Sequence, residues 1–346
     1  MKVIDTFQRY TIAVPELFAP IYAELEAVEA FLNAQAETPI PQFSALTRHL
    51  LSAGGKRLRP ALVILSAYAA SPERFGERYR NGHGNSTRLI AIAGCMEMIH
   101  MATLIHDDVI DQTFLRRGKP TVNALYGNLA TVLSGDYILA RALRYLALDG
   151  DLRIIQQVAQ VTTAMSEGEV QEVFLRRQLN LSEQDYLEVV RRKTAEFIAG
   201  CCRVGGYLVD AEEATLDALE SFGRHLGIAF QIVDDLLDYV GDPEATGKPN
   251  GVDFREGCAT LPLIHFYANA PEPLRRALQS EFGVPIAPER FAYYTEQMRL
   301  AGSLRYAAEV AECYRQKALE ALRTLTPSLA RKTLEEVARF ITERKY

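Results

Sequence analysis

Long stretches of helical periodicity dominate this chain. Apolar residues recur every three or four positions over residues 88–111, 129–148, 186–209, 214–240 and 303–325. This spacing is typical of helices that bury one face, and each stretch is longer than an ordinary strand. Alternating runs of the kind that form half-buried strands are scarce. The pattern therefore predicts an all-α protein.

Turn signals separate these stretches without dividing the chain into domains. They lie at residues 71–72, 80–85, 149–150, 241–243 and 271–273. The sequence contains no linker rich in Gly, Ser or Pro, and no internal repeat is evident. We therefore expect a single large helical bundle, with ten or more helices, over residues 1–346.

Composition narrows the class of protein. Of the 346 residues, 48% are apolar, which is enough for a large buried core. The formal net charge of −6 is not the basic footprint of nucleic-acid binding, so we expect no nucleic-acid partner. The five cysteines form no CxxC pair and residues 1–20 lack signal-peptide features, which predicts a cytoplasmic location. Apolar runs are too short or too interrupted by charge to predict a transmembrane segment.

Two acidic clusters end apolar helical stretches. The same DDxxD spacing occurs at Asp107, Asp108 and Asp111 and again at Asp234, Asp235 and Asp238. Residues four apart share one helix face, so each cluster places two carboxylates about 6 Å apart. Their repulsion, their loss of hydration and the negative end of the helix dipole all oppose this arrangement. A hard cation such as Mg²⁺, which takes carboxylate and phosphate oxygens, would compensate for these effects.

Each cluster also has a plainer interpretation, as a solvated acidic helix end. A single DDxxD motif does not decide between the two interpretations. Its recurrence after two separate apolar stretches favours two opposed carboxylate clusters that hold a diphosphate through bridging metal ions.

Basic residues near the clusters are candidate phosphate ligands. The segment GGKRLRP at 54–60 places three cations after two glycines, which permit close approach of the backbone to a ligand. The further candidates are Arg116 and Arg117 after the first cluster, Lys193 within a helix, Lys248 after the second cluster, and His100, two turns before Asp107. Taken singly, each lysine or arginine also fits a surface cation, and His100 also fits a buried structural residue.

These segments together resemble the trans-isoprenyl diphosphate synthases, also called polyprenyl synthetases. The resemblance extends to about Leu325 and depends on GGKRLRP, LIHDDVID, LRRGKPT, GDYILA, RKTAEF and FQIVDDLLDYVGDPEATGKPNGVDFREG. It implies the isoprenoid synthase fold, a helical bundle around a central active-site cavity, and a homodimer. It also implies a magnesium-dependent prenyltransferase with three Mg²⁺ ions per active site, for which Mn²⁺ can substitute.

The resemblance gives individual residues a role. The match to the isopentenyl diphosphate site consists of Lys56, Arg59, His100 and Arg117. The residues that match the allylic diphosphate site are Arg116, Lys193, Gln231 and Lys248. The implied metal ligands are Asp107, Asp111 and Asp234, supported by Asp108 and Asp238, with Asp235 acting through water. The implied catalytic residues are Asp107, Asp108, Asp111, Lys193, Asp234 and Lys248.

Two positions depart from the family pattern. Glu172 stands four residues after Gly168, where relatives often have Gln. Gln171 comes one position earlier, so a role for Gln171 is in doubt. Cys258 occupies a position at which many relatives have Lys, and we expect it to be structural.

The implied reaction is a head-to-tail (1′-4) condensation of isopentenyl diphosphate with an allylic diphosphate such as farnesyl or geranylgeranyl diphosphate. Ionisation of the allylic C–O bond separates charge, so stabilisation of the departing diphosphate is the main requirement. Apolar helices would shield the carbocation from water. A peripheral contact with a membrane for product release stays open.

Product length is expected to depend on the helix that precedes Asp107. Ala102 and Thr103 are small where short-chain relatives tend to have an aromatic ring, and Ile99 follows below them. One helical turn and one isoprene unit are both about 5 Å long, so an open path admits roughly one unit per turn. The stretch resembles enzymes that make C35–C50 chains for quinones. A shorter-chain synthase is the alternative, with a floor from another helix, for example Tyr137.

Two other functions are less favoured. Terpene cyclases share a similar helical fold, but they typically carry a different second metal motif built from Asn or Asp, Ser or Thr, and Glu. Non-catalytic helical subunits usually lose part of one acidic cluster, and both clusters are intact in this sequence.

Overall fold

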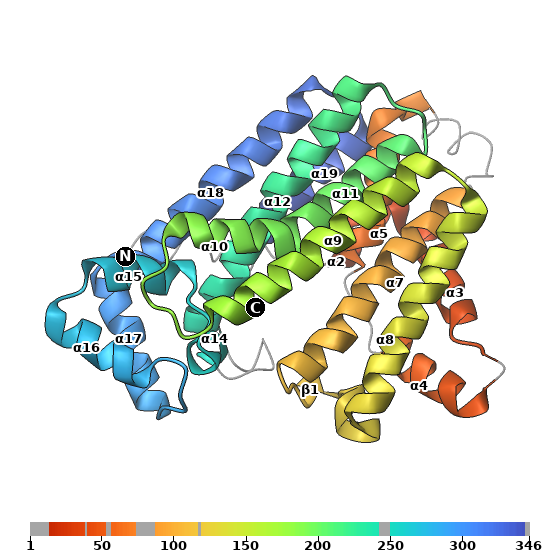
Figure 1. The fold of residues 1–346 in the computed structure, drawn as a ribbon. Coiled ribbons are helices and arrows are strands. Elements are labelled where there is room, and N and C mark those ends of the chain that lie inside the picture. The colour runs from red at the N-terminus through yellow and green to blue at the C-terminus, as the bar shows by residue number, and fades with distance from the viewer. Residues whose placement is uncertain are drawn as a thin grey trace.

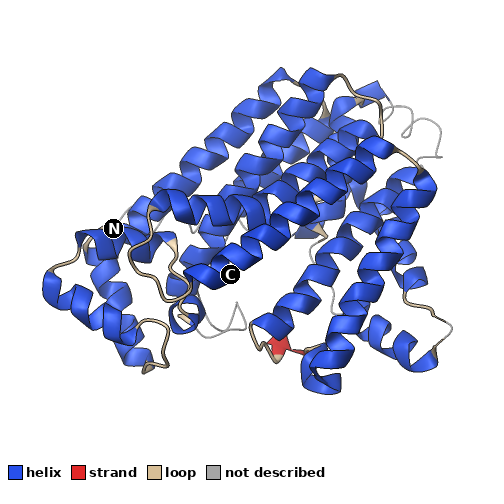
Figure 2. Cartoon of the chain, in the orientation of Figure 1, coloured by secondary structure: helices blue, strands red, loops and turns tan. Residues whose placement is uncertain are grey.

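Helices make up almost the whole molecule. The computed structural model describes residues 14–38, 40–52, 57–73, 87–116, 119–241 and 250–342. In these ranges the only strands are one short hairpin, drawn in red in Figure 2. It pairs β1 (Leu115–Arg116) with antiparallel β2 (Lys119–Pro120). The predicted all-α class is confirmed.

The helices follow the order shown by the colour gradient of Figure 1. The first half contains α2 (Val14–Leu17), η1 (Ala19–Ile21), α3 (Tyr22–Gln35), α4 (Pro41–Ser52), α5 (Leu58–Ala70), α7 (Thr87–Ile110), α8 (Val122–Asp149) and α9 (Leu152–Leu175). The second half contains α10 (Glu183–Val190), η2 (Arg191–Ala195), α11 (Glu196–Tyr207), α12 (Glu213–Val240), α14 (Val252–Glu256), α15 (Leu261–Asn269), α16 (Glu272–Glu281), α17 (Pro288–Leu300), α18 (Ser303–Ala321), η3 (Leu322–Thr324) and α19 (Leu329–Thr342).

The predicted stretches correspond to helices, with two differences. The stretch at 129–148 extends back to Val122 and is interrupted at Gly127, whose φ of 79° lies outside the helical region. The stretch at 186–209 contains α10, η2 and α11 as one continuous run, in which η2 is a π-helical turn. Apolar periodicity does not reveal this turn, because a single extra residue only shifts the phase of the pattern.

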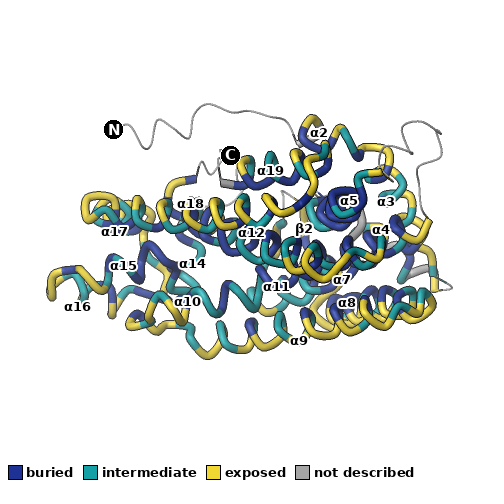
Figure 3. The backbone as a smooth tube through the Cα atoms, turned by 90° about the horizontal axis from the view of Figure 1, so that it is seen from above, coloured by how far each residue is buried: buried dark blue, intermediate teal, exposed yellow. Residues whose placement is uncertain are grey.

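The helices α5 and α7 lie inside the bundle. Ten of the 13 residues of α5 are buried, and α5 packs against α7, α11 and α19. The helix α7 packs along α8 and also contacts α3 and α5. Among the described helices, α7 alone has the length and composition of a membrane span, but 72% of its apolar window is buried within the bundle. Its apolar character is therefore accounted for by its place in the core, which Figure 3 shows in dark blue.

Two glycines allow three helices to meet backbone to backbone. A Cβ atom on Gly227 of α12 would lie 2.6 Å from the Cα atom of Ala195 in η2. A Cβ atom on Gly168 of α9 would lie 2.7 Å from the backbone nitrogen of Lys193, also in η2. Real Cβ contacts are longer than this, so glycine is required at both positions. The turn that carries Lys193 is therefore closely packed between α9 and α12.

A smaller aromatic core supports α14. The buried ring of Phe254 lies 5.4 Å from that of Phe282 and 5.6 Å from that of Tyr294, measured between ring centroids. The same cluster includes Tyr239 near the end of α12. It therefore fixes α14, which carries Asp253, next to the acidic end of α12.

Candidate active site

The two acidic clusters open on one cavity. The first cluster lies at the end of α7, with Asp111 just beyond its last residue, and the second lies in the last turns of α12. Asp111 and Asp235, one from each cluster, both line a cavity of about 170 Å³. The fold therefore brings together two motifs that are far apart in the sequence.

Elements from the middle of the chain complete this cavity. Its charged wall consists of Asp111, Glu172, Arg176, Lys193, Asp235, Asp253 and Glu256. Its apolar wall includes Leu175, Leu181, Val189 and Val190. The cavity thus combines carboxylates, two cations and an apolar side, which suits a ligand with an anionic head and an apolar body.

The first acidic cluster is partly buried and is paired with arginines. Burial raises the pKa of Asp107 to about 7; Glu169 and Asp111 act in the same direction, and nearby cations oppose them. The carboxylate of Asp108 accepts a contact of 2.7 Å from a guanidinium nitrogen of Arg116. The carboxylate of Asp111 accepts one of 2.7 Å from Arg176. Both arginines thus supply positive charge to the end of α7.

The second cluster is held by hydrogen bonds. Asp235 accepts a hydrogen bond of 2.6 Å from the hydroxyl of Tyr186 and one of 2.9 Å from the amide of Gln231. Burial nevertheless raises the pKa of Asp235 to about 7. Asp238 accepts the backbone N–H groups of Val252 and Asp253 at 3.0 and 3.2 Å, which ties α14 to α12. Asp234 is exposed, so its carboxylate is accessible to a ligand.

Asp253 is a further acidic residue of the site that the sequence interpretation missed. It lines the cavity, and burial together with the charges of Asp238, Asp235 and Glu172 raises its pKa well above the usual value. The signal for it was the segment GVDFREG, which follows the second cluster closely in sequence. Asp253 joins the site because α14 packs against α12, a contact that the local sequence does not reveal.

The arrangement fits a hard divalent cation. Carboxylates from two helix ends are partly buried and lie close to one another, and burial raises the pKa of Asp107 and of Asp235. Among the described residues no group of three His, Cys, Asp or Glu side chains surrounds one point. The donor set itself suits magnesium, since carboxylate oxygens are hard ligands and Mg²⁺ usually takes one or two of them together with water and phosphate oxygens. One oxygen of Glu169 and Nε of Arg176 are also buried without a hydrogen-bond partner in the described part of the chain.

Lys193 lies between two glutamates on α9. Its ammonium group contacts Glu169 at 2.8 Å and also pairs with Glu172. Burial by itself lowers the pKa of Lys193, but the two carboxylates outweigh burial, so the net shift is upward and the ammonium stays charged. The next residue, Thr194, donates a hydrogen bond of 2.8 Å to Gln231. The predicted allylic-site residues Lys193 and Gln231 are therefore neighbours in the cavity wall.

The two departures from the family pattern both concern the cavity wall. Glu172, which replaces the usual Gln, is an ion-pair partner of Lys193 and lines the cavity. Cys258, expected to be structural, also lines the cavity, and burial raises the pKa of its thiol. Gln171 is not among the residues that line the cavity. The five cysteines are free, so Cys258 forms no disulfide.

Part of the predicted isopentenyl site is described. Arg59 lies in the first turn of α5, and His100 lies on α7; both are partly exposed. Lys56, Arg117 and Lys248 lie outside the described residues.

Arg57, which has no predicted role of its own, is buried at the start of α5. Its φ of 47° is unusual for a residue other than glycine. Its guanidinium group pairs with Glu29 of α3 and, at 3.0 Å, with Glu97 of α7. Arg57 therefore joins three helices and fixes the turn before Arg59.

The predicted chain-length residues lie on α7 as expected. Ile99 and Ala102 are buried, and Thr103 is partly exposed. The hydroxyl of Thr103 donates a hydrogen bond of 2.8 Å to the carbonyl oxygen of His100, so its polar group is satisfied within the helix. Tyr137, the candidate floor, packs edge-on against Phe43 of α4 with ring centroids 4.7 Å apart.

Comparison with known proteins decides the family. The family model described as polyprenyl synthetase matches residues 40–287, a range that contains both acidic clusters and Lys193. The chain belongs to the polyprenyl synthetase family. An octaprenyl diphosphate synthase of Escherichia coli (strain K12) is 34% identical over 325 residues, covering 93% of this chain and 96% of that one. The predicted family and prenyltransferase class are confirmed.

Solved structures agree with this family assignment. A decaprenyl diphosphate synthase from Rhodobacter capsulatus superposes with a TM-score of 0.87 at 33% identity, covering 96% of this polyprenyl synthetase and all of that chain. A polyprenyl synthase from Caulobacter crescentus CB15, solved with calcium and isoprenyl diphosphate, gives a TM-score of 0.89 at 33% identity and covers 98% and 100% of the two chains. The fold is thus that of the isoprenyl synthases, and the named products of its relatives support the long-chain type.

Proposed function

We propose that this polyprenyl synthetase condenses isopentenyl diphosphate with farnesyl or geranylgeranyl diphosphate to form a C35–C50 chain for a quinone. The observation that carries the proposal is that Asp111 and Asp235, from separate DDxxD clusters, line the same cavity as Lys193. An octaprenyl and a decaprenyl diphosphate synthase among the similar proteins support a long product.

The carboxylates would hold the metal ions. The proposed ligands are Asp107, Asp111 and Asp234, with Asp108 and Asp238 in support and Asp235 acting through water. When bound, Mg²⁺ supplies positive charge that stabilises a diphosphate leaving group, and Mn²⁺ can take its place. We propose that these carboxylates would hold three ions per site.

The basic residues act on the two diphosphates. Arg116, Lys193, Gln231 and Lys248 would hold the allylic diphosphate, and the charged ammonium of Lys193 would stabilise it as it departs. The residues proposed to position isopentenyl diphosphate are Lys56, Arg59, His100 and Arg117. Holding both substrates in one site lowers the barrier because their reacting carbons meet without a further loss of freedom.

The carbocation formed in this reaction must be kept from water. The apolar side of the cavity, which includes Leu175, Leu181 and Val190, provides this shield. Ala102, Thr103 and Ile99 would then face the growing tail along α7. Because α7 is surrounded by other helices, a tail that lies along it would be shielded from water.

A second copy of the chain is proposed to cover the exposed face of α8. Leu125, Leu129 and Leu133 on this face are 50%, 77% and 55% exposed, and α8 lies at one edge of the bundle in Figure 3. The same helix carries Asp136 and Arg144, each four residues from Ala140. A two-fold axis near Ala140 would place the acid of one copy beside the base of the other. The face is therefore self-complementary in charge as well as apolar.

We further propose a cytoplasmic location. The support is that Cys95, Cys201 and Cys202 are buried as free thiols, which is typical of proteins from a reducing compartment. Release of the apolar product would use a peripheral contact with a membrane.

One assay tests the proposed reaction. The purified chain is incubated with Mg²⁺, farnesyl diphosphate and labelled isopentenyl diphosphate, and the products are separated by length. Elongated linear diphosphates that disappear when EDTA removes the metal are the expected result. A cyclic hydrocarbon would indicate a terpene cyclase, and no turnover would indicate a non-catalytic subunit; either outcome contradicts the proposal.

A further inference from the structure

The π turn η2 is closed on its outer side by an ion pair. In a π turn the backbone hydrogen bond joins residues i and i+5. The backbone N–H of Glu196 donates such a bond to the carbonyl oxygen of Arg191. The side chains of the same two residues form an ion pair, so they connect the two ends of the turn a second time.

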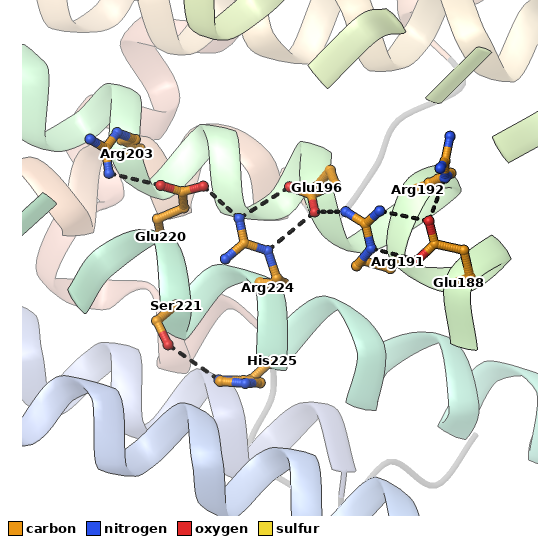
Figure 4. A network of polar contacts seen from close by, with 9 residues as sticks. All are labelled: Glu188, Arg191, Arg192, Glu196, Arg203, Glu220, Ser221, Arg224 and His225. Atoms are coloured by element: carbon orange, nitrogen blue, oxygen red, sulfur yellow. Dashed lines mark hydrogen bonds and ion pairs between the residues drawn. The ribbon is translucent and has the colours of Figure 1, made fainter. Parts of the chain in front are cut away.

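Glu196 also joins this turn to α12. Its two carboxylate oxygens accept hydrogen bonds of 3.2 and 3.3 Å from Nε and Nη2 of Arg224. The Glu196 side chain is only 10% exposed. Arg191 is held from its other side by Glu188 of α10, at 2.8 and 2.7 Å. Figure 4 shows Glu196 between the two arginines.

Glu220 and Arg203, on the other side of Arg224, anchor that arginine and do not contact the turn. Glu220 accepts a hydrogen bond of 2.5 Å from Arg224 and another of 2.7 Å from Arg203 (Figure 4). Glu196 is therefore the residue of this network that links the π turn to α12. This network lines a hollow of about 270 Å³ that is separate from the active-site cavity.

The side chains of the π turn point toward two different parts of the molecule. Arg191 and Glu196 face the network, whereas Lys193 and Thr194 line the active-site cavity. One residue of an α-helix corresponds to about 100° of rotation, so loss of the extra residue of a π turn would redirect the side chains near it. The direction of Lys193 thus depends on the π turn being maintained.

We propose that Glu196 is a positioning residue, which maintains the π turn by bridging Arg191 and Arg224 and so directs Lys193 into the active site. This inference rests on the proposed role of Lys193 with the allylic diphosphate. Exposed ion pairs contribute little, but Glu196 is buried and bonded on both sides, so its removal leaves two arginines without their shared partner. The glycines that pack against η2 allow the turn, and Glu196 selects it.

The test compares Glu196→Gln with Glu220→Gln. Both replacements remove one carboxylate from the same network, but only the first removes it from the turn. We expect Glu196→Gln to lower kcat about 10- to 100-fold, since a misplacement of 1 Å at a reacting centre has effects up to about that size. The KM for isopentenyl diphosphate should stay unchanged, because that substrate is held by other helices. Glu220→Gln should keep the wild-type kcat.

Two further measurements separate positioning from simple loss of stability. In a Lys193→Met background, Glu196→Gln should have no additional effect on kcat, because it acts through Lys193. A crystal structure of Glu196→Gln should show Lys193 moved away from Glu169 and Glu172. An equal effect in both backgrounds, or an unchanged π turn and unchanged Lys193, would overturn the inference.

The structural measurement does not depend on the proposed reaction. If the wild-type chain shows no prenyl transfer, the proposed function fails, while the position of Lys193 in Glu196→Gln still decides the inference. If Glu196→Gln does not fold, Arg191→Gln removes the same ion pair from its other end. The same loss of kcat and the same displacement of Lys193 are then expected.

Discussion

Replacement of Ala102 by Phe should stop chain growth after one or two isoprene units. Ala102 lies five residues before Asp107 on α7, which at a rise of 1.5 Å per residue is about 7.5 Å along the helix axis. An isoprene unit is about as long as one helical turn, so a ring at this position leaves room for little more than one unit. The expected product is therefore no longer than C10, in place of C35–C50.

A second variant, with its ring further from Asp107 along α7, tests how product length depends on the position of the ring. Ile92 is buried on α7 fifteen residues before Asp107, about 22 Å along the axis, so Ile92→Phe should permit about four units. The helix begins at Thr87, twenty residues before Asp107, about 30 Å or six units away. A C35 tail must therefore extend beyond the start of α7, and both variants should shorten it by amounts that follow their positions.

The assay measures product length after incubation with Mg²⁺, labelled isopentenyl diphosphate and a five- or ten-carbon allylic diphosphate. A fifteen-carbon primer is unsuitable for Ala102→Phe because it would already reach the new ring. The matched control is Met101→Phe, an adjacent and similarly buried position that points about 100° away and gains little volume. Because Ala102 is only 2% exposed, overpacking should lower stability by about 1–3 kcal/mol, which thermal unfolding will report.

Full-length product from folded Ala102→Phe would refute the path along α7. Equal product lengths from Ala102→Phe and Ile92→Phe would also contradict it, because the blocking rings would then not act in order along the helix. Shortening by Met101→Phe as well would mean that general distortion of α7, and not obstruction, limits the tail.

Three further predictions follow from the charges and the exposed faces. In the metal-free protein Asp107 and Asp235 keep their protons up to about pH 7, whereas an unfolded aspartate loses its proton near pH 4. The folded state then binds more protons, so the melting temperature should fall as the pH rises from about 4 to 8, and Mg²⁺ should reverse the fall; a flat profile by scanning fluorimetry contradicts this. Lys193→Met should lower kcat about 10²- to 10³-fold without changing the KM for isopentenyl diphosphate, and a change confined to that KM would exclude an allylic role. Leu129→Glu combined with Leu133→Glu should convert the proposed dimer into monomers, as measured by light scattering, and a dimer that persists would contradict the proposed interface.

The sequence was sufficient to predict the helices and to recognise the acidic clusters as a candidate site, but for different reasons. Helices such as α7 and α12 are long enough that their apolar spacing is unambiguous. The aspartates were recognisable because two like-charged residues at the end of an apolar helix are unfavourable without a ligand. Both conclusions depend only on residues close together in the chain.

The contacts that complete the site depend on residues far apart in the chain, and for this reason the sequence did not reveal them. Arg176 pairs with Asp111, 65 residues away, and nothing in the local sequence distinguishes it from Arg177. Arg57 stands between two predicted phosphate ligands, yet its guanidinium group is committed to Glu97 on another helix. Periodicity also gave no sign of the π turn, although the direction of Lys193 depends on it.

The ion pairs of the site indicate how it tolerates its own negative charge. Arg116 pairs with Asp108 and Arg176 with Asp111, while Lys193 pairs with glutamates of α9. Buried carboxylates without a counter-charge would weaken the fold, so these cations stabilise the metal-free state. In the proposed reaction these cations would meet the negative charge of a diphosphate once their carboxylates hold metal ions. A side chain released from its carboxylate would then neutralise a phosphate oxygen, so the proposed function predicts that these ion pairs exchange when substrate and metal bind.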